Sequence, residues 1–227
     1  MNDRIGGAGR DLTVRVKTAR KRSTSSTRWL QRQLNDPYVA AARREGYRSR
    51  AAYKLLEIDD QHHLLRQGAR VLDLGATPGG WTQVCVARVG AGRVLAVDIN
   101  EMDAVPGAQF MQIDFLSPEA PDLIRAALGG AVDAVLSDMA SPATGHRMTD
   151  HARIIALCDL AYEFACEVLA PGGTFCAKVL QGGTEAKLLT RMKRSFASVR
   201  HVKPKSSRAD SKEIYVLATG FKGIVAQ

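Results

Sequence analysis

The chain has 227 residues, of which 45% are hydrophobic and 24% charged, and its net charge is +9. A chain of this length can bury a full hydrophobic core in one domain. It has no apolar run near the ~20 residues of a membrane-spanning helix, and its start lacks the apolar stretch of a signal peptide. The four cysteines form neither a CxxC pair nor a metal-ligand spacing, so we expect free thiols in a reducing compartment. These features disfavour secreted, membrane-spanning and zinc-ribbon proteins.

The charge is unevenly distributed along the chain. Residues 1–50 carry 13 Lys and Arg against 4 Asp and Glu, residues 51–186 carry 9 against 17, and residues 187–212 carry 9 against 1. Two basic segments thus flank an acidic middle. Cations at this density favour binding of a polyanionic partner over the alternative that the Lys and Arg side chains are only exposed to solvent. Nucleic acid is the first candidate and an anionic membrane surface the second.

The first residues are rich in Arg, Lys, Ser, Thr and Gly, and we interpret residues 1–27 as a disordered basic arm. The same composition is typical of mitochondrial transit peptides, an alternative that Asp3 and Asp11 weaken without excluding. A single folded domain is expected over residues 28–227. Its first part, residues 28–60, is predicted to be helical and to contribute to binding of the polyanion.

Two helix boundaries are readable in this first part. Asp36 followed by Pro37 is typical of a helix start, and Gly46 is typical of its end. Ser49 is placed to cap the next helix, RAAYKLLEID, which has one apolar face. The sequence therefore predicts that helices precede the first strand.

Short apolar strands then alternate with helices. We predict strands at 71–74, 94–98, 110–113, 132–137 and 174–180, and helices at 81–89, 118–128, 151–169 and 184–195. This alternation indicates a mostly parallel sheet with helices on both faces. Two late strands, at 199–202 and 214–219, have no helix between them and are expected to form an antiparallel hairpin at one edge. The predicted fold is a Rossmann-like α/β fold with seven strands.

A glycine-rich loop follows the first predicted strand. In DLGATPGGW, the glycines at positions 75, 79 and 80 stand between a strand and a helix, where glycine permits a tight turn and close approach of a ligand. The spacing is not GxGxxG, and no Lys-Ser/Thr pair follows as in a P-loop. Taken alone, the loop fits a plain strand-to-helix connection as well as a ligand site.

Four predicted strands each end in an aspartate: Asp73, Asp98, Asp114 and Asp138. The carboxyl ends of parallel strands meet at one edge of the sheet, where ligands of α/β folds bind. One such aspartate is more often a turn or helix cap, but four beside a glycine loop favour a ligand site. Asp98 could reach the ribose hydroxyls of a nucleotide-like cofactor, and Asp114 an adenine amino group. So acidic a site suits a cation such as S-adenosylmethionine, because pyrophosphate would be repelled.

The motifs DLGATPGGW, VDIN, QIDF, SDMA and CAKVLQG, preceded by RSRAAYKL, give the sequence a specific resemblance. From about Thr27 to Gly223 it resembles the FtsJ-like (RrmJ) family of ribose 2′-O-methyltransferases. The resemblance implies a methyltransferase fold, S-adenosylmethionine as cofactor, and 2′-O-methylation of a uridine ribose in the 23S RNA of the large ribosomal subunit. The family pattern commonly has Ala or Ser in place of Thr77, and Ala-Pro-Asn in place of residues 140–142.

The resemblance also implies a catalytic tetrad made of Lys54, Asp138, Lys178 and Glu213. Lys54 could instead be a solvated helix lysine, and Glu213 a surface residue before an edge strand. Lys178 is harder to explain in this way. It stands in the apolar strand TFCAKVL, where a lysine is costly unless it is paired or functional.

By the same resemblance, Gly79, Trp81, Asp98, Asp114 and Asp138 contact the cofactor. Trp81 has a strong alternative, because a tryptophan at a helix start can simply pack in the core. The chemistry needs no metal. The basic segments 28–50 and 187–212 are expected to hold the phosphates around the target nucleotide.

The expected partner is ribosomal RNA, within the large subunit, and we expect a cytoplasmic monomer with no membrane contact. Mitochondrial targeting by the basic arm stays open. One rival is the same chemistry on another RNA, a transfer RNA or an mRNA cap, because those relatives share the tetrad. A rival of another class is a non-catalytic RNA-binding assembly factor with a relict cofactor site. The intact tetrad argues against that second rival.

Overall fold

The computed structural model describes residues 15, 16, 18, 23–142, 144–182, 186–208 and 210–223, without the side chains of residues 25, 28, 29 and 147. Most of the arm predicted over residues 1–27 lies outside this part of the chain. The first helix begins at Thr24, before the helical part predicted from residue 28, because the Ser23 side chain accepts a hydrogen bond from the backbone of Ser26 and caps it.

Seven strands form one sheet in the order β3-β2-β1-β4-β5-β7-β6. The pairs from β3 to β5 are parallel, whereas β7 pairs antiparallel with both β5 and β6. The predicted seven-stranded sheet with an antiparallel edge hairpin is therefore confirmed, with β6 as the outer strand. The bounds are β1 Val71–Leu74, β2 Val94–Asp98, β3 Ala108–Gln112, β4 Val132–Ser137, β5 Leu169–Leu180, β6 Phe196–Val202 and β7 Glu213–Phe221.

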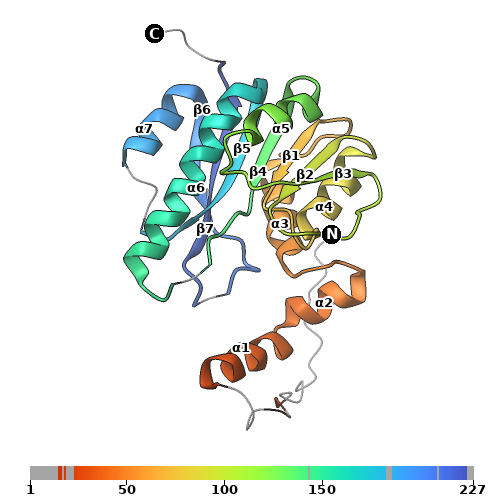
Figure 1. The fold of residues 1–227 in the computed structure, drawn as a ribbon, viewed down its shortest axis with the longest axis vertical. Helices are drawn as coiled ribbons and strands as arrows, with labels where there is room; N and C mark the ends of the chain where they lie inside the picture. The colour runs from red at the N-terminus through yellow and green to blue at the C-terminus, as the bar shows by residue number, and fades with distance from the viewer. Residues whose placement is uncertain are drawn as a thin grey trace.

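Helices cover both faces of this sheet, as predicted (Figure 1). The core residues of α5, α6 and α7 pack with Leu72, Leu74 and Val135 in one cluster, and those of α3 and α4 pack with Val71 and Leu136 in another. Neighbouring strand residues thus point to opposite faces. The bounds are α1 Thr24–Leu34, α2 Pro37–Glu45, α3 Ala51–His62, α4 Gly80–Val89, α5 Ala120–Leu128, α6 Arg147–Val168 and α7 Ala186–Ser195. No described helix is both long and apolar enough to cross a membrane.

Two local predictions were wrong. Ser49 does not cap α3: Arg50 occupies the N-cap without a side-chain bond, and the Ser49 hydroxyl is buried without a hydrogen-bond partner in the described part of the chain. This hydroxyl instead packs against Gly80, where a Cβ atom would lie 2.4 Å from it. The strand predicted at 174–180 begins earlier, because β5 starts at Leu169, and its pairing with β4 shifts register between Val132 and Ala134.

The helices α1 and α2 extend from the end of the molecule where the β6–β7 loop also lies (Figure 1). The start of α2 is as predicted, because the Asp36 carboxylate accepts a hydrogen bond from the Tyr38 backbone at 3.0 Å. The helices reach the loop through ion pairs of Arg32 with Asp210 at 3.5 Å and of Asp36 with Arg208 at 3.0 Å. Segments far apart in sequence are thereby joined beside the sheet.

Candidate active site

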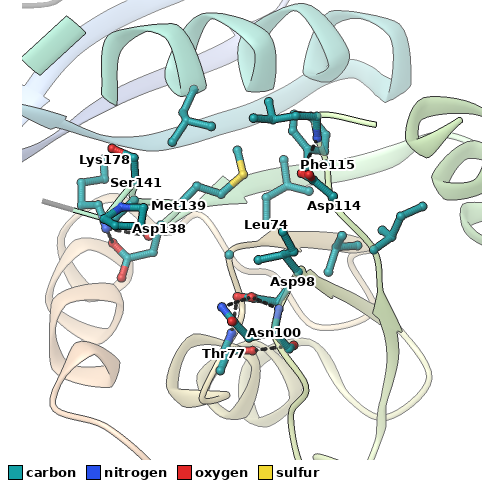
Figure 2. A pocket seen from close by; sticks show the side chains of 18 residues that line it. Leu74, Thr77, Asp98, Asn100, Asp114, Phe115, Asp138, Met139, Ser141 and Lys178 are labelled. Carbon is teal, nitrogen blue, oxygen red and sulfur yellow. Dashed lines mark hydrogen bonds and ion pairs between the residues drawn. The ribbon is translucent and has the colours of Figure 1, made fainter. Parts of the chain in front are cut away.

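A pocket of about 500 Å³ opens at the carboxyl ends of β1, β2, β3 and β4. We call it the acidic pocket. The strand order reverses beside β1: the chain runs outward from β1 through β2 to β3 and then returns to β4 on the other side of β1. Ligands of α/β folds bind at such a reversal. Its polar lining includes Thr77, Asp98, Asn100, Asp114, Asp138 and Lys178 (Figure 2).

The glycine loop between β1 and α4 brings three segments together. Gly75 has φ +77°, and a Cβ atom there would lie 2.7 Å from the Met139 backbone nitrogen. Gly79 has φ +106°, and a Cβ atom there would lie 2.9 Å from Nη1 of Arg48. Only glycine fits this conformation and spacing. Gly75 lines the acidic pocket and Gly79 does not, so cofactor contact by Gly79 stays a prediction.

Asp98 holds two loops at the rim of the acidic pocket. One carboxylate oxygen accepts a hydrogen bond from the Thr77 backbone at 2.9 Å, and the other accepts bonds from the Asn100 backbone at 2.8 Å and side chain at 3.0 Å (Figure 2). The Thr77 hydroxyl, where the family commonly has Ala or Ser, donates to the Asn100 carbonyl oxygen at 3.3 Å. The departure at Thr77 therefore adds a contact and leaves the pocket open.

Asp114 follows β3 and accepts a hydrogen bond from the Leu116 backbone at 2.9 Å. Ile99 and Leu116 line the same part of the acidic pocket, and each is 58% exposed. Exposed apolar side chains beside a carboxylate form a surface suited to a flat ring with a polar edge. The structure thus brings Asp98, Asp114 and Asp138 into one pocket, as predicted.

Asp73 does not join the other three aspartates. The strand continues to Leu74, and Asp73 is fully buried, accepting a hydrogen bond from the Thr82 hydroxyl at 2.7 Å. Burial raises its pKa to about 7, and the carboxylates of Asp138 and Asp98 act in the same direction. Its assignment to a strand end was wrong, because its side chain points to α4 and not to the sheet edge.

Lys178 and Asp138 form a buried pair at one end of the acidic pocket (Figure 2). Nζ of Lys178 lies 3.2 Å from Oδ1 of Asp138 and donates to the Asp138 carbonyl oxygen at 2.6 Å. The Lys178 side chain is only 7% exposed. The costly lysine of β5 is therefore paired, as the apolar strand around it requires.

Lys54 and Glu213 form the second lysine–carboxylate pair, with Nζ donating to Oε2 at 2.8 Å. Burial pushes the pKa of Glu213 upward, but the charges of Lys54 and Lys178 outweigh it and hold that pKa below its ordinary value. Glu213 is therefore ionised at neutral pH. The four residues of the expected tetrad come from α3, the end of β4, β5 and β7, and the structure brings them together.

Tyr215 joins the two pairs and was missed from the sequence. Its hydroxyl donates to Oδ1 of Asp138 at 2.9 Å, and Nζ of Lys54 lies 5.8 Å from the centre of its ring. Burial, reinforced by Asp138 and Glu213, raises the pKa of Tyr215 well above its ordinary value, so it acts as a neutral donor. The signal was available, since residues two apart on a strand share a face and Tyr215 follows Glu213 by two.

Trp81 lies in the core. It is 2% exposed, its indole nitrogen donates to the Ala51 carbonyl oxygen at 2.9 Å, and its ring packs on Tyr215 with centres 5.4 Å apart. Trp81 is not part of the lining of the acidic pocket. The structure supports the core alternative, and direct cofactor contact by Trp81 stays a prediction.

Arg48 fastens the loop that follows β2. Its guanidinium donates to the carbonyl oxygens of Asp103 and Ala104, both at 2.6 Å, and to that of Pro78 at 3.4 Å. Sequence reasoning counted Arg48 only among the cations of segment 28–50, because no local pattern reveals partners about fifty residues away.

All four cysteines are free, as expected, and Cys85, Cys158 and Cys176 are buried. Within the described part of the chain, no three His, Cys, Asp or Glu side chains lie close enough to hold a metal ion.

The sheet order, the acidic pocket at the strand-order reversal and the two adjoining lysine–carboxylate pairs define a Rossmann-like methyltransferase. The sequence profile of the FtsJ-like methyltransferases matches residues 47–221. The chain therefore belongs to the FtsJ-like methyltransferase family, as the resemblance predicted.

Similar proteins agree with this assignment. A protein of Parvibaculum lavamentivorans named Ribosomal RNA large subunit methyltransferase E is 64% identical, over 96% of this chain and 90% of its own length. One of the same name from Xanthobacter autotrophicus is 60% identical, over 96% and 87%. Among solved structures, a Plasmodium falciparum protein described as a ribosomal RNA methyltransferase is 30% identical with a TM-score of 0.69, and the match covers 78% of this chain and all 100% of that one.

Proposed function

We propose that this protein transfers a methyl group from S-adenosylmethionine to the 2′-hydroxyl of a uridine ribose in the 23S RNA of the large ribosomal subunit. The observation that carries the proposal is the pair of lysine–carboxylate contacts, Lys178–Asp138 and Lys54–Glu213, beside the acidic pocket. The names of the relatives that are 64% and 60% identical support the large-subunit RNA as substrate.

The chemistry of the acidic pocket fits S-adenosylmethionine. Three carboxylates and one lysine line it, so it favours a cation with an adenosine and disfavours a phosphorylated ligand. Asp98 would hold the ribose hydroxyls, and Asp114 with Ile99 and Leu116 would hold the adenine. When bound, S-adenosylmethionine supplies an electrophilic methyl group, and the protein supplies binding, orientation and electrostatics.

The task of the tetrad is to align the 2′-hydroxyl and to manage its proton. Alignment alone can contribute up to ~7–11 kcal/mol to lowering the barrier. Lys178, at the end of the acidic pocket, either accepts the proton or holds the hydroxyl and its developing negative charge. Asp138 fixes the position of Lys178, and the Tyr215 hydroxyl fixes Asp138 in turn.

The positions of the cations in segment 187–212 narrow the surface that we expect to bind RNA. Of the basic segment 187–212, Arg191 lies on α7 and pairs with Asp159 and Glu163 of α6. In contrast, Lys203, Lys205 and Arg208 lie in the β6–β7 loop that meets α1 and α2. We therefore assign RNA contact to this loop together with the residues of segment 28–50 that contact it, Arg32 and Arg50 among them. We expect the protein to act as a monomer in the cytoplasm, with mitochondrial targeting by residues 1–27 as the alternative.

Two measurements test the proposed function. S-adenosylmethionine should raise the melting temperature of the purified protein. Mapping of 2′-O-methyl groups on large-subunit RNA from cells lacking the protein should show one missing mark, which the purified protein restores and the Lys178→Ala variant does not. Cofactor binding without any missing mark would favour a non-catalytic assembly factor. A mark missing from transfer RNA or mRNA would change the acceptor.

A further inference from the structure

A second pocket, of about 560 Å³, lies between α1, α2 and the β6–β7 loop. We call it the basic pocket. None of its lining residues lines the acidic pocket. Its volume falls within the ~300–1,000 Å³ of small-ligand sites. Segments that lie about 170 residues apart in sequence thus form a cavity that the proposed chemistry does not use.

The lining of the basic pocket is arranged for an anion. Asp36 is 8% exposed and pairs with two guanidinium groups, those of Arg50 and Arg208, each at 3.0 Å. One buried carboxylate therefore fixes the orientation of both arginines. Arg32 and Lys205 add two further cations, against one more carboxylate, Asp210. Fixed guanidinium groups with net positive charge are the side chains that bind phosphate in a defined orientation.

Three lining residues of the basic pocket carry a buried polar atom without a hydrogen-bond partner in the described part of the chain: Nε of Arg50 and the hydroxyls of Ser206 and Ser207. Ser206 and Ser207 are 1% and 6% exposed. Buried polar groups in folded proteins nearly always have partners. These three atoms are covered by their surroundings, so the groups that a ligand in the basic pocket would meet are the more exposed cations Arg32 and Lys205.

One side of the basic pocket offers a planar stacking surface. The guanidinium carbon of Arg50 lies 5.8 Å from the centre of the Tyr38 ring, and Tyr38 packs on Tyr53 with ring centres 5.3 Å apart. Nucleotide bases that are splayed out of a helix stack on aromatic rings and on arginine planes. The basic pocket thus combines a phosphate site with a base site.

The basic pocket adjoins the tetrad. A smaller hollow is lined by Arg32, Arg50 and Arg208 from the basic pocket and also by Glu213. Glu213 binds Lys54 at 2.8 Å. An RNA strand whose target ribose reaches the tetrad would therefore pass the basic pocket with a neighbouring nucleotide.

We propose that the basic pocket holds one unpaired nucleotide of the substrate RNA next to the methylated ribose, with its phosphate on Arg32, Arg50 and Arg208 and its base against Arg50 and Tyr38. This inference rests on the proposed function, since it requires an RNA substrate. It deepens that function by specifying that the target lies in an unpaired stretch, because bases of a continuous duplex stay stacked and paired.

Site-specific photocrosslinking tests the position of the nucleotide. The Asn35→p-benzoylphenylalanine variant carries the photoreactive group in the lining of the basic pocket, and the Arg44→p-benzoylphenylalanine variant carries it on an exposed part of α2 outside. Both are irradiated with large ribosomal subunits from cells lacking the protein. We expect the first to crosslink to one nucleotide adjacent to the methylated ribose and the second to show no such preference. Crosslinks from position 35 that are absent or as scattered as those from position 44 would overturn the inference.

A kinetic comparison keeps the inference testable if the bulky photoreactive group blocks activity. Arg32→Gln and Arg44→Gln remove the same charge from exposed ion pairs with Asp210 and Glu45. We expect Arg32→Gln to raise the KM for large subunits about tenfold, the effect of one lost charge-assisted contact, at unchanged kcat and cofactor affinity. Equal KM changes in both variants would overturn the inference, because the basic pocket would then contribute only a general electrostatic attraction. If the wild-type protein methylates no RNA, the proposed function itself fails.

Discussion

The acidic pocket and the basic pocket lie on either side of the tetrad and differ in the sign of their charge. Three aspartates line the first, whereas arginines fixed by Asp36 line the second. Under the proposed function, each pocket would admit the ligand that the other repels: a sulfonium cofactor on one side and a phosphodiester strand on the other. The tetrad stands where the two ligands would meet, since Lys178 lines the acidic pocket and Glu213 lines the hollow beside the basic one.

The largest expected effect is on the rate of methyl transfer, and it comes from substitution of Lys178 in the tetrad. Lys178→Ala should lower the rate of methyl transfer by ~10²–10⁴, the usual contribution of a positioned acid or base. Affinity for S-adenosylmethionine should stay near normal, because Asp98 and Asp114 are untouched. Single-turnover transfer of a labelled methyl group to large ribosomal subunits measures the rate, and calorimetry measures the affinity.

Lys178→Arg distinguishes the two roles open to this lysine. Arginine keeps the charge but does not release a proton near neutral pH. If Lys178 accepts the proton, the Arg variant should be nearly as slow as the Ala variant. If Lys178 holds developing charge, Arg should keep appreciable activity. Wild-type rates in both variants would exclude Lys178 from the chemistry.

The next largest effect should be on S-adenosylmethionine binding in the acidic pocket alone. Asp98→Ala should weaken S-adenosylmethionine binding by ~1–3 kcal/mol, because hydrogen bonds to a charged group are lost. RNA binding should not change. Glu101→Ala removes an exposed carboxylate three residues away that does not line the acidic pocket and serves as the control. Calorimetry that gives the same affinity for both variants would remove Asp98 from the cofactor site.

The two pockets also differ in how far the sequence predicts them. The acidic pocket is built from strand ends, and apolar strands ending in Asp98 and Asp138 are readable because the edge of a parallel sheet follows from strand order. Asp73 was misassigned because it is the penultimate residue of the strand, which the sequence predicted with the correct bounds, and its side chain turns to Thr82 of α4. A position one residue before the strand end is enough to place a side chain in the core and not at the sheet edge.

The basic pocket could be predicted only as charge. The sequence placed cations in segments 28–50 and 187–212, but the contact of Asp36 with Arg208 depends on the tertiary fold. Arg191 and Arg208 look alike in sequence, yet the first pairs with α6 and the second with α2. The pairing of Tyr215 with Asp138 likewise requires the register of β5 and β7, which local patterns do not give.

A smaller effect should follow from loosening Asp138 while leaving both pockets intact. Tyr215→Phe removes the hydroxyl that donates to Asp138, and the rate of methyl transfer should fall about tenfold, the equivalent of ~1.4 kcal/mol for one such bond. Tyr162→Phe removes a buried hydroxyl that is hydrogen-bonded to Ser195 in another part of the core. It should cost stability in a thermal melt without slowing transfer. Equal rate losses in both variants would attribute the effect to stability alone.

The smallest expected effect tests which part of the second basic segment faces the RNA. Neutralising Lys203 and Lys205 in the β6–β7 loop should reduce the slope of log affinity against log salt by ~1.4, because each lost contact with a single-strand phosphate contributes ~0.7. The double variant Lys187→Gln with Lys193→Gln removes the same charge from exposed positions of α7 and should leave the slope unchanged. Filter binding of large-subunit RNA over a range of salt concentrations measures both slopes, and S-adenosylmethionine affinity should be normal throughout. If the α7 variant shows the larger change in slope, RNA runs over the α6–α7 side of the sheet. In that case the opposite charges of the acidic and basic pockets do not explain how the two substrates approach the tetrad.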